Sequence, residues 1–160
     1  MFTNKHIIVA MLVTPVLAIL AWFAVGAFVG EDPQQATPGQ SYPLVERSNC
    51  RYDSGQCDLR NEDLRLSITV ETTASGATLL LSSSHALDQV LLGVATDGVN
   101  DQPRNLQRQD SAGLRWALSM RDLPSPEQRL LIAVTAGGSH WFADTSTAFL
   151  DPYREQSGSE

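Results

Sequence analysis

The sequence predicts a mainly β protein, with one N-terminal transmembrane helix followed by an antiparallel immunoglobulin-like β-sandwich of about seven strands. Two observations predict this fold class. A run of 23 residues over 7–29 carries no charge. From residue 64 onward, apolar and polar side chains alternate with the period of two that is typical of half-buried strands. A length of 160 residues suits one domain rather than two.

The apolar run over 7–29 is long enough to cross a membrane. At about 1.5 Å per residue, such a helix spans the roughly 30 Å of the hydrocarbon layer. A cleaved signal peptide is the alternative, because the small residues at 24–26 would suit a peptidase. The apolar part of a signal peptide is only about 7–15 residues long, however. We therefore expect a retained anchor that places the chain in the lipid bilayer.

Charges on either side of this run predict its orientation. Lys5 precedes it, and Glu31 and Asp32 follow it. Because positive flanks stay in the cytoplasm, residues 1–6 should form a cytoplasmic stub. The predicted location is the inner cell membrane, crossed once, with the C-terminal domain in the periplasm. Gly26 and Gly30 have the spacing that lets two membrane helices approach closely, so they are candidates for helix–helix interaction.

The rest of the chain divides into three predicted parts. Residues 30–42 are rich in Pro, Gln and Gly and predict a flexible linker. Residues 43–150 predict the periplasmic β-sandwich, and residues 151–160 lack periodicity and predict a disordered tail. The expected strands are 64–71, 77–82, 90–95, 104–109, 114–120, 130–134 and 141–149. Short strands separated by turn residues, without a long amphipathic helix, are typical of an antiparallel sandwich.

Part of this pattern resembles a known family. Gly113, Leu114, Arg115 and Trp116 precede alternating Leu118 and Met120. This stretch is similar to a glycine-x-x-tryptophan hairpin in the FixH/YtkA-like group of bacterial membrane-anchored proteins. The resemblance covers 64–149 and implies a role in respiratory-oxidase assembly and metal supply. The chain departs from the group by a cysteine pair before the sandwich and by lacking a Met/His-rich copper stretch, so no functional residue is carried over.

Cys50 and Cys57 flank a turn sequence and form the clearest candidate pair. In an oxidising compartment they are expected to close a small loop as a disulfide. A redox-active pair is a weaker alternative, because the C-x-x-C spacing is missing. Metal ligation by both thiols is the third alternative.

Two histidines of the domain, His85 and His140, together with Met120, form an alternative metal site. A metal site usually needs three or four converging ligands, so no metal and no cofactor is the primary expectation. Trp116 alternates with Leu114 and Leu118 in a core-facing pattern. Trp141 is therefore the better candidate for an interface aromatic.

The composition and motifs favour binding over catalysis. Eighteen acidic residues against 11 basic ones give a net charge of −7, which argues against a nucleic-acid partner. No phosphate-binding, dinucleotide or paired-carboxylate motif is present, so an enzyme is not expected. The predicted function is an accessory or assembly factor that binds an envelope protein or a respiratory complex. The alternatives are a periplasmic copper carrier and a thiol-exchange protein.

Overall fold

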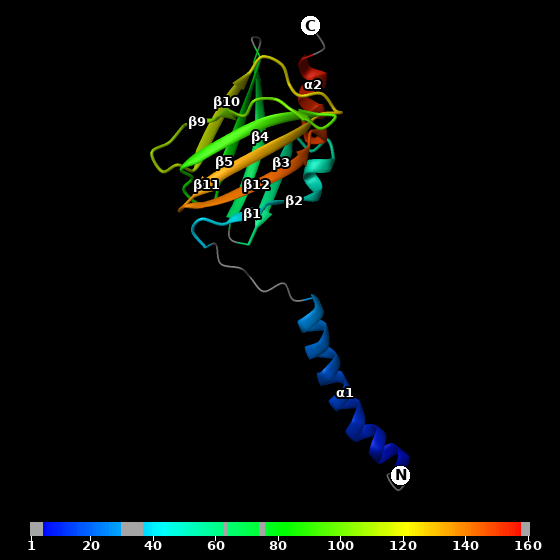
Figure 1. Ribbon diagram of the computed structural model, residues 1–160. Helices are drawn as coiled ribbons and strands as arrows, with labels where there is room; N and C mark the ends of the chain where they lie inside the picture. Colours follow the sequence, from blue (N-terminus) through cyan, green and yellow to red (C-terminus); the bar gives the residue numbers. More distant parts are fainter. Residues whose placement is uncertain (1–4, 30–36, 63, 74–75, 158–160) are drawn as a thin grey trace. The chain divides into compact units, whose positions relative to one another are not determined.

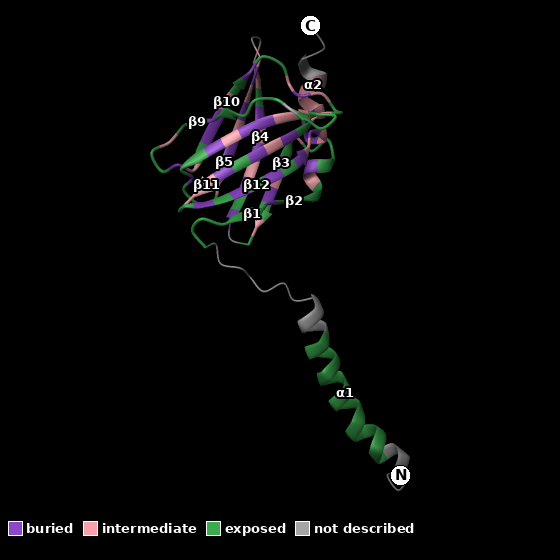
Figure 2. Cartoon of the chain, in the orientation of Figure 1, coloured by how far each residue is buried: buried purple, intermediate pink, exposed green. Residues whose placement is uncertain are grey.

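The computed structural model describes residues 5–29, 37–62, 64–73 and 76–157 (Figure 1). The chain divides into two compact units between Gln34 and Gln35. The first unit contains helix α1, Lys5–Val29, with Pro15 inside it. Its described apolar side chains are exposed (Figure 2). Judged on the described part of the chain, no helix is long and apolar enough to cross a membrane.

The second unit is built from two β-sheets whose strands are almost all antiparallel. Sheet A has the strand order β1-β12-β11-β6-β7, with β8 also paired to β6, and sheet B has the order β2-β3-β4-β5-β10-β9. The strands of sheet A are β1 (Ser41–Pro43), β6 (Gln89–Thr96), β7 (Val99–Asn100), β8 (Arg104–Asn105), β11 (Arg129–Ala136) and β12 (Ser139–Ser146). Those of sheet B are β2 (Val45–Glu46), β3 (Gln56–Asn61), β4 (Leu64–Thr73), β5 (Gly76–Ser83), β9 (Gln107–Arg108) and β10 (Arg115–Met120). Two 3-10 turns, η1 (Ser48–Arg51) and η2 (Ala148–Leu150), and helix α2 (Asp151–Ser157) complete the unit.

The two sheets share one hydrophobic core. Alternate residues of β4, including Leu66 and Ile68, are buried against alternate residues of β6 and β11, including Leu92 and Ile132. The period-two pattern predicted for 64–71 is confirmed, and so is the hairpin that pairs β4 with β5. Figure 2 shows buried and exposed positions alternating along these strands.

At both edges of the sheets the chain passes from one sheet to the other through a buried leucine. Leu44 lies between β1 of sheet A and β2 of sheet B, and its N–H donates to the carbonyl of Phe142 at 2.7 Å. Leu106 lies between β8 and β9, and its N–H donates to the carbonyl of Val90 at 2.9 Å. These two leucines are only 6% and 4% exposed. Each of these two segments, where the chain switches from one sheet to the other, therefore closes one edge of the core.

The strand number and topology refine the sequence prediction. In the described residues, seven strands have six residues or more, namely β3, β4, β5, β6, β10, β11 and β12. Strand β3 was not predicted, and the predicted strand over 104–109 is instead the switch formed by β8 and β9. The long strands divide four and three between the sheets, as in a constant-type immunoglobulin domain. The topology differs, however. Counted along the chain, the first three long strands, β3, β4 and β5, lie in sheet B, and the fourth, β6, is the first in sheet A. In a constant-type domain the third strand already belongs to the second sheet.

The chain boundaries of this unit also differ from the prediction. The end of the predicted linker, 30–42, forms β1, while residues 30–36 lie outside the described residues. The prediction of a disordered tail is wrong for 151–157, which form α2. This helix is held by side chains, because the Tyr153 hydroxyl donates to the Gly55 carbonyl at 2.9 Å. Arg154 Nε donates to the Pro124 carbonyl, also at 2.9 Å.

We predict that Leu106→Ala lowers the free energy of unfolding by about 2–5 kcal/mol, because truncation of this buried leucine leaves a cavity in the core. Urea denaturation of the full-length chain, followed by tryptophan fluorescence, measures this change. Val99→Ala is the control, since Val99 is 72% exposed, and should cost under about 0.5 kcal/mol. Equal effects of the two substitutions would show that the switch leucine does not secure the core.

Candidate functional site

The cysteine pair forms the predicted disulfide. Cys50 in η1 and Cys57 in β3 are bonded, and both are fully buried. Thr145 of β12 lies against this bridge, with its Oγ1 3.4 Å from the Cys57 sulfur. Because exchange requires a thiolate to reach a disulfide sulfur, this burial favours a structural bridge over a thiol-exchange site.

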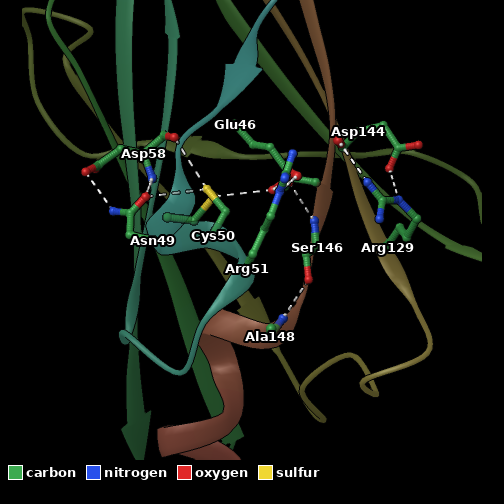
Figure 3. Close-up of polar contacts among 11 residues, drawn as sticks. Glu46, Asn49, Cys50, Arg51, Asp58, Arg129, Asp144, Ser146 and Ala148 are labelled. Carbon is green, nitrogen blue, oxygen red and sulfur yellow. Dashed lines mark hydrogen bonds and ion pairs between the residues drawn. A yellow bond between two sulfur atoms is a disulfide. The ribbon is translucent and has the colours of Figure 1, made fainter.

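Beside the disulfide, the carboxylate of Glu46 joins the two sheets (Figure 3). It accepts a hydrogen bond from Arg51 Nε at 2.6 Å. On the sheet A side, it accepts hydrogen bonds from the Thr145 hydroxyl at 2.8 Å and from the Ser146 N–H at 3.2 Å. Burial by itself raises the pKa of Glu46, but these donors outweigh burial, and the pKa lies below the ordinary value of 4.5. Glu46 is therefore charged in the folded protein at neutral pH.

A second carboxylate, Asp58 of β3, lies on the other side of the disulfide (Figure 3). It accepts hydrogen bonds from Asn49 Nδ2 and Gln56 Nε2, both at 2.8 Å. Burial by itself raises the pKa of Asp58, but hydrogen bonds from Gln56, Ser67 and Asn49 and the nearby charge of Arg47 outweigh burial, so the pKa lies below the ordinary value of 3.8. The two carboxylates thus hold the small disulfide loop from both sides.

The three side chains of the alternative metal site do not converge. Met120 pairs with Ala77 at the start of β5, and His85 follows the end of β5. The strand between these points is about 20 Å long. Met120 is also buried in the core, and His140 of β12 is engaged with the Thr135 hydroxyl at 3.0 Å from its Nδ1. Among the described residues, no three His, Cys, Asp or Glu side chains are grouped as metal ligands.

The candidate interface residues lie in different places. Trp141 is only 9% exposed and packs on Tyr42, with ring centroids 6.0 Å apart. Its selection as an interface aromatic is therefore wrong, because it faces the core. Its neighbour Phe142 points outward instead and is 51% exposed. Gly26 lies near the C-terminal end of α1, and Gly30 lies outside the described residues.

Phe142 belongs to an apolar row on the outer face of sheet A. Register places the residues of this row side by side on four adjacent strands. We call them the sheet A strip: Pro43, Phe142, Ala133 and Leu91. Pro43, Phe142 and Ala133 are exposed and Leu91 is half-buried. With strands about 4.8 Å apart, the strip is about 15 Å long.

Polar residues border most of the strip, and Leu131 lies beside it on one side. On one side the next row is Ser41, His140, Thr135 and Gln89. On the other side the next row is Asp144, the half-buried Leu131 and Gly93. Asp144 forms an ion pair with Arg129 at 2.5 Å between Oδ1 and Nε (Figure 3). An apolar centre with a polar rim is the composition of a protein-binding surface. Residues two apart in a strand lie on the same face. The charged Asp144, two residues after Phe142, is therefore the sequence signal that Phe142 faces solvent.

The stretch that resembles the FixH/YtkA-like group forms the turn into β10. Gly113 has a φ of +70°, and a Cβ there would lie 2.9 Å from the Leu87 carbonyl oxygen. The Trp116 indole N–H donates to the Gly113 carbonyl at 3.0 Å. Compared with known proteins, the chain matches no family model, no curated protein and no solved structure. The resemblance therefore stays a prediction.

We predict that Glu46→Gln weakens the acid dependence of stability. A carboxylate with a lowered folded-state pKa contributes stability that is complete above its unfolded value, 4.5, and is lost as pH falls through the folded pKa. Urea denaturation of the full-length chain between about pH 6 and about pH 3 measures this slope.

The matched control for this prediction is Glu71→Gln. Glu71 is exposed on β4 and makes no ion pair within the described ranges. This control should retain the wild-type slope. If Glu46→Gln also retained it, the carboxylate would not be the group that couples the two sheets to pH.

Proposed function

We propose that this protein is a membrane-anchored interaction module. Residues 7–29 anchor it in the cell membrane, and the β-sheet unit lies in the periplasm, where it binds an envelope protein through the sheet A strip. In this role it acts as an accessory or assembly factor for an envelope or respiratory complex. The observation that carries the proposal is the exposure of Phe142, an aromatic side chain, at the centre of an apolar row.

The ends of the sheets favour a face over an edge as the binding surface. The outermost strands β1, β2, β7 and β9 have only two or three residues each. Short edge strands offer few unpaired backbone groups to an incoming strand. On β12, beyond the end of β1, the N–H of Ser146 donates to the Glu46 carboxylate. A partner therefore gains more from the strip than from added strand pairing.

Charge decides which kind of partner fits the strip. Residues 31–160 contain 10 arginines and 18 acidic residues, a net charge of −8. Two such units brought face to face would repel each other, so a second copy of the chain is a poor occupant. We assign the strip to a different protein, with an apolar centre and a basic rim that complements this acidic unit.

The anchor and the compartment rest on sequence and chemistry. The uncharged run falls entirely within α1, and its apolar side chains occupy all sides of the helix rather than one face. A helix that is apolar all round needs an apolar environment on every side. The Cys50–Cys57 disulfide is in keeping with an oxidising compartment such as the periplasm.

A photo-crosslinking amino acid at position 142 in cells tests the partner. We predict one discrete crosslinked protein from Phe142, because the partner covers it. The same amino acid at Tyr52, an aromatic residue that is 66% exposed in the disulfide loop, is the control and should give no such product. Equal products from both positions, or a product from 142 that contains only a second copy of the chain, would contradict the proposal.

Carbonate extraction of cell membranes tests the anchor. We predict that the full-length chain stays in the membrane pellet with its N-terminal residues intact by mass. Leu17→Arg, at the middle of the run, should shift the chain towards the soluble fraction, because a central arginine costs about 2.5–3.5 kcal/mol on insertion scales. Leu17→Val should behave as the wild type. Release of the wild-type chain, or loss of its first residues, would refute a retained anchor.

A further inference from the structure

The arginines of the β-sheet unit are divided into paired and unpaired groups. Four of them form ion pairs with Glu46, Asp110, Asp144 and Asp151. Arg108 lies over the Trp116 ring, 5.2 Å from its centroid. Within the described ranges, the other five form no ion pair, and they are Arg47, Arg60, Arg65, Arg104 and Arg121. Of these, Arg47 is near enough to Asp58 to lower the pKa of that carboxyl.

Three of these unpaired arginines line one groove on the outer face of sheet B. The groove has a volume of about 380 Å³ and includes Arg47, Arg60 and Arg65. This volume lies in the range of small-ligand sites. With Asp58 as the one acidic lining residue, the groove carries a net charge of +2 on a chain whose total is −7.

Strand register brings two of the positive charges together. Arg60 of β3 is directly opposite Arg65 of β4, and both side chains are exposed. Like charges at directly opposed positions destabilise a sheet. An anion held between the two guanidinium groups would relieve that repulsion, and planar guanidinium groups bind phosphate and carboxylate through paired hydrogen bonds.

Hydroxyl and carboxylate groups complete the groove. Ser67 and Ser82 face each other on β4 and β5, and Ser83 and Ser84 follow. Asp58 of β3 lies opposite Ser67 of β4 and accepts hydrogen bonds from Asn49, Gln56 and Ser67. Because a carboxylate offers about four lone-pair positions, Asp58 can accept one further hydrogen bond. Such acceptors match the hydroxyl groups of a polyol.

We propose that this groove is a binding site for a phosphate ester of a polyol, such as glycerol phosphate or a sugar phosphate. Arg60 and Arg65 hold the phosphate, Arg47 adds positive charge, and Asp58 with the serines binds the hydroxyl groups. An acidic peptide is disfavoured, because its additional carboxylates would lie near the carboxylate of Asp58, whereas the hydroxyl groups of a polyol can donate to it. This site lies on sheet B and does not depend on a partner at the sheet A strip.

Calorimetric titration of the purified full-length chain with glycerol phosphate tests the site. We expect saturable binding that weakens at least about tenfold in Arg60→Gln and in Arg65→Gln, a change of about 1.4 kcal/mol. Arg104→Gln is the matched control, an exposed unpaired arginine on β8 of sheet A, and should bind as the wild type does. Absence of saturable binding, an equal loss in Arg104→Gln, or binding of oligoglutamate in place of glycerol phosphate would overturn the proposal.

Two further measurements complete the test. Without ligand, Arg60→Gln should unfold at a temperature no lower than the wild type, because it removes the repulsion between Arg60 and Arg65. A lower unfolding temperature would show that Arg60 makes a stabilising contact and is not held against a like charge. Vesicles rich in phosphatidylglycerol distinguish the two sources of a polyol phosphate. Competition by vesicles that is lost in Arg65→Gln identifies a lipid headgroup, and binding of glycerol phosphate without such competition identifies a free ester.

Discussion

The β-sheet unit depends on its two edges being closed by chain segments that change sheets. Leu44 and Leu106 are buried at these changes, and each is also tied to sheet A by its backbone N–H. At the Leu44 edge, the Glu46 carboxylate adds a second link, because it sits on β2 of sheet B and accepts hydrogen bonds from β12 of sheet A. The disulfide then holds η1 and β3 behind that carboxylate. Closure of the edges leaves the two outer faces as the extended surfaces of the unit.

Those two faces differ in chemistry, and this difference organises the functional proposals. Sheet A presents an apolar row that contains Phe142, with polar residues along most of its border. Sheet B presents the groove with Arg60 and Arg65, whose guanidinium groups lack ion-pair partners in the described part of the chain. One face suits a protein partner and the other an anionic ligand. The two faces lie on opposite sides of one shared core, so occupation of one does not block the other.

The sequence predicted those features that depend on local burial. Leu64 to Val70 alternate because one face of β4 is buried, and the cysteine pair is near enough in sequence to be recognised. The sheet changes could not be predicted, since two-residue strands such as β8 and β9 have no periodicity. In β12 the inward residues after Trp141 are small or hydroxylated, so hydrophobicity did not distinguish the two faces. The groove depends on the register that opposes Arg60 to Arg65, and this pairing required β3, which was not predicted.

The central claim is that the outer face of sheet A is covered by a partner in the cell and that the disulfide loop is not. Hydroxyl-radical footprinting tests it most directly, by comparing the oxidation of Phe142 and Tyr52 in native membranes with that in the purified full-length chain. Both rings are exposed in the isolated chain, at 51% and 66%. The account predicts that native membranes protect Phe142 strongly and leave Tyr52 unchanged. Equal oxidation of Phe142 in the two samples would contradict it.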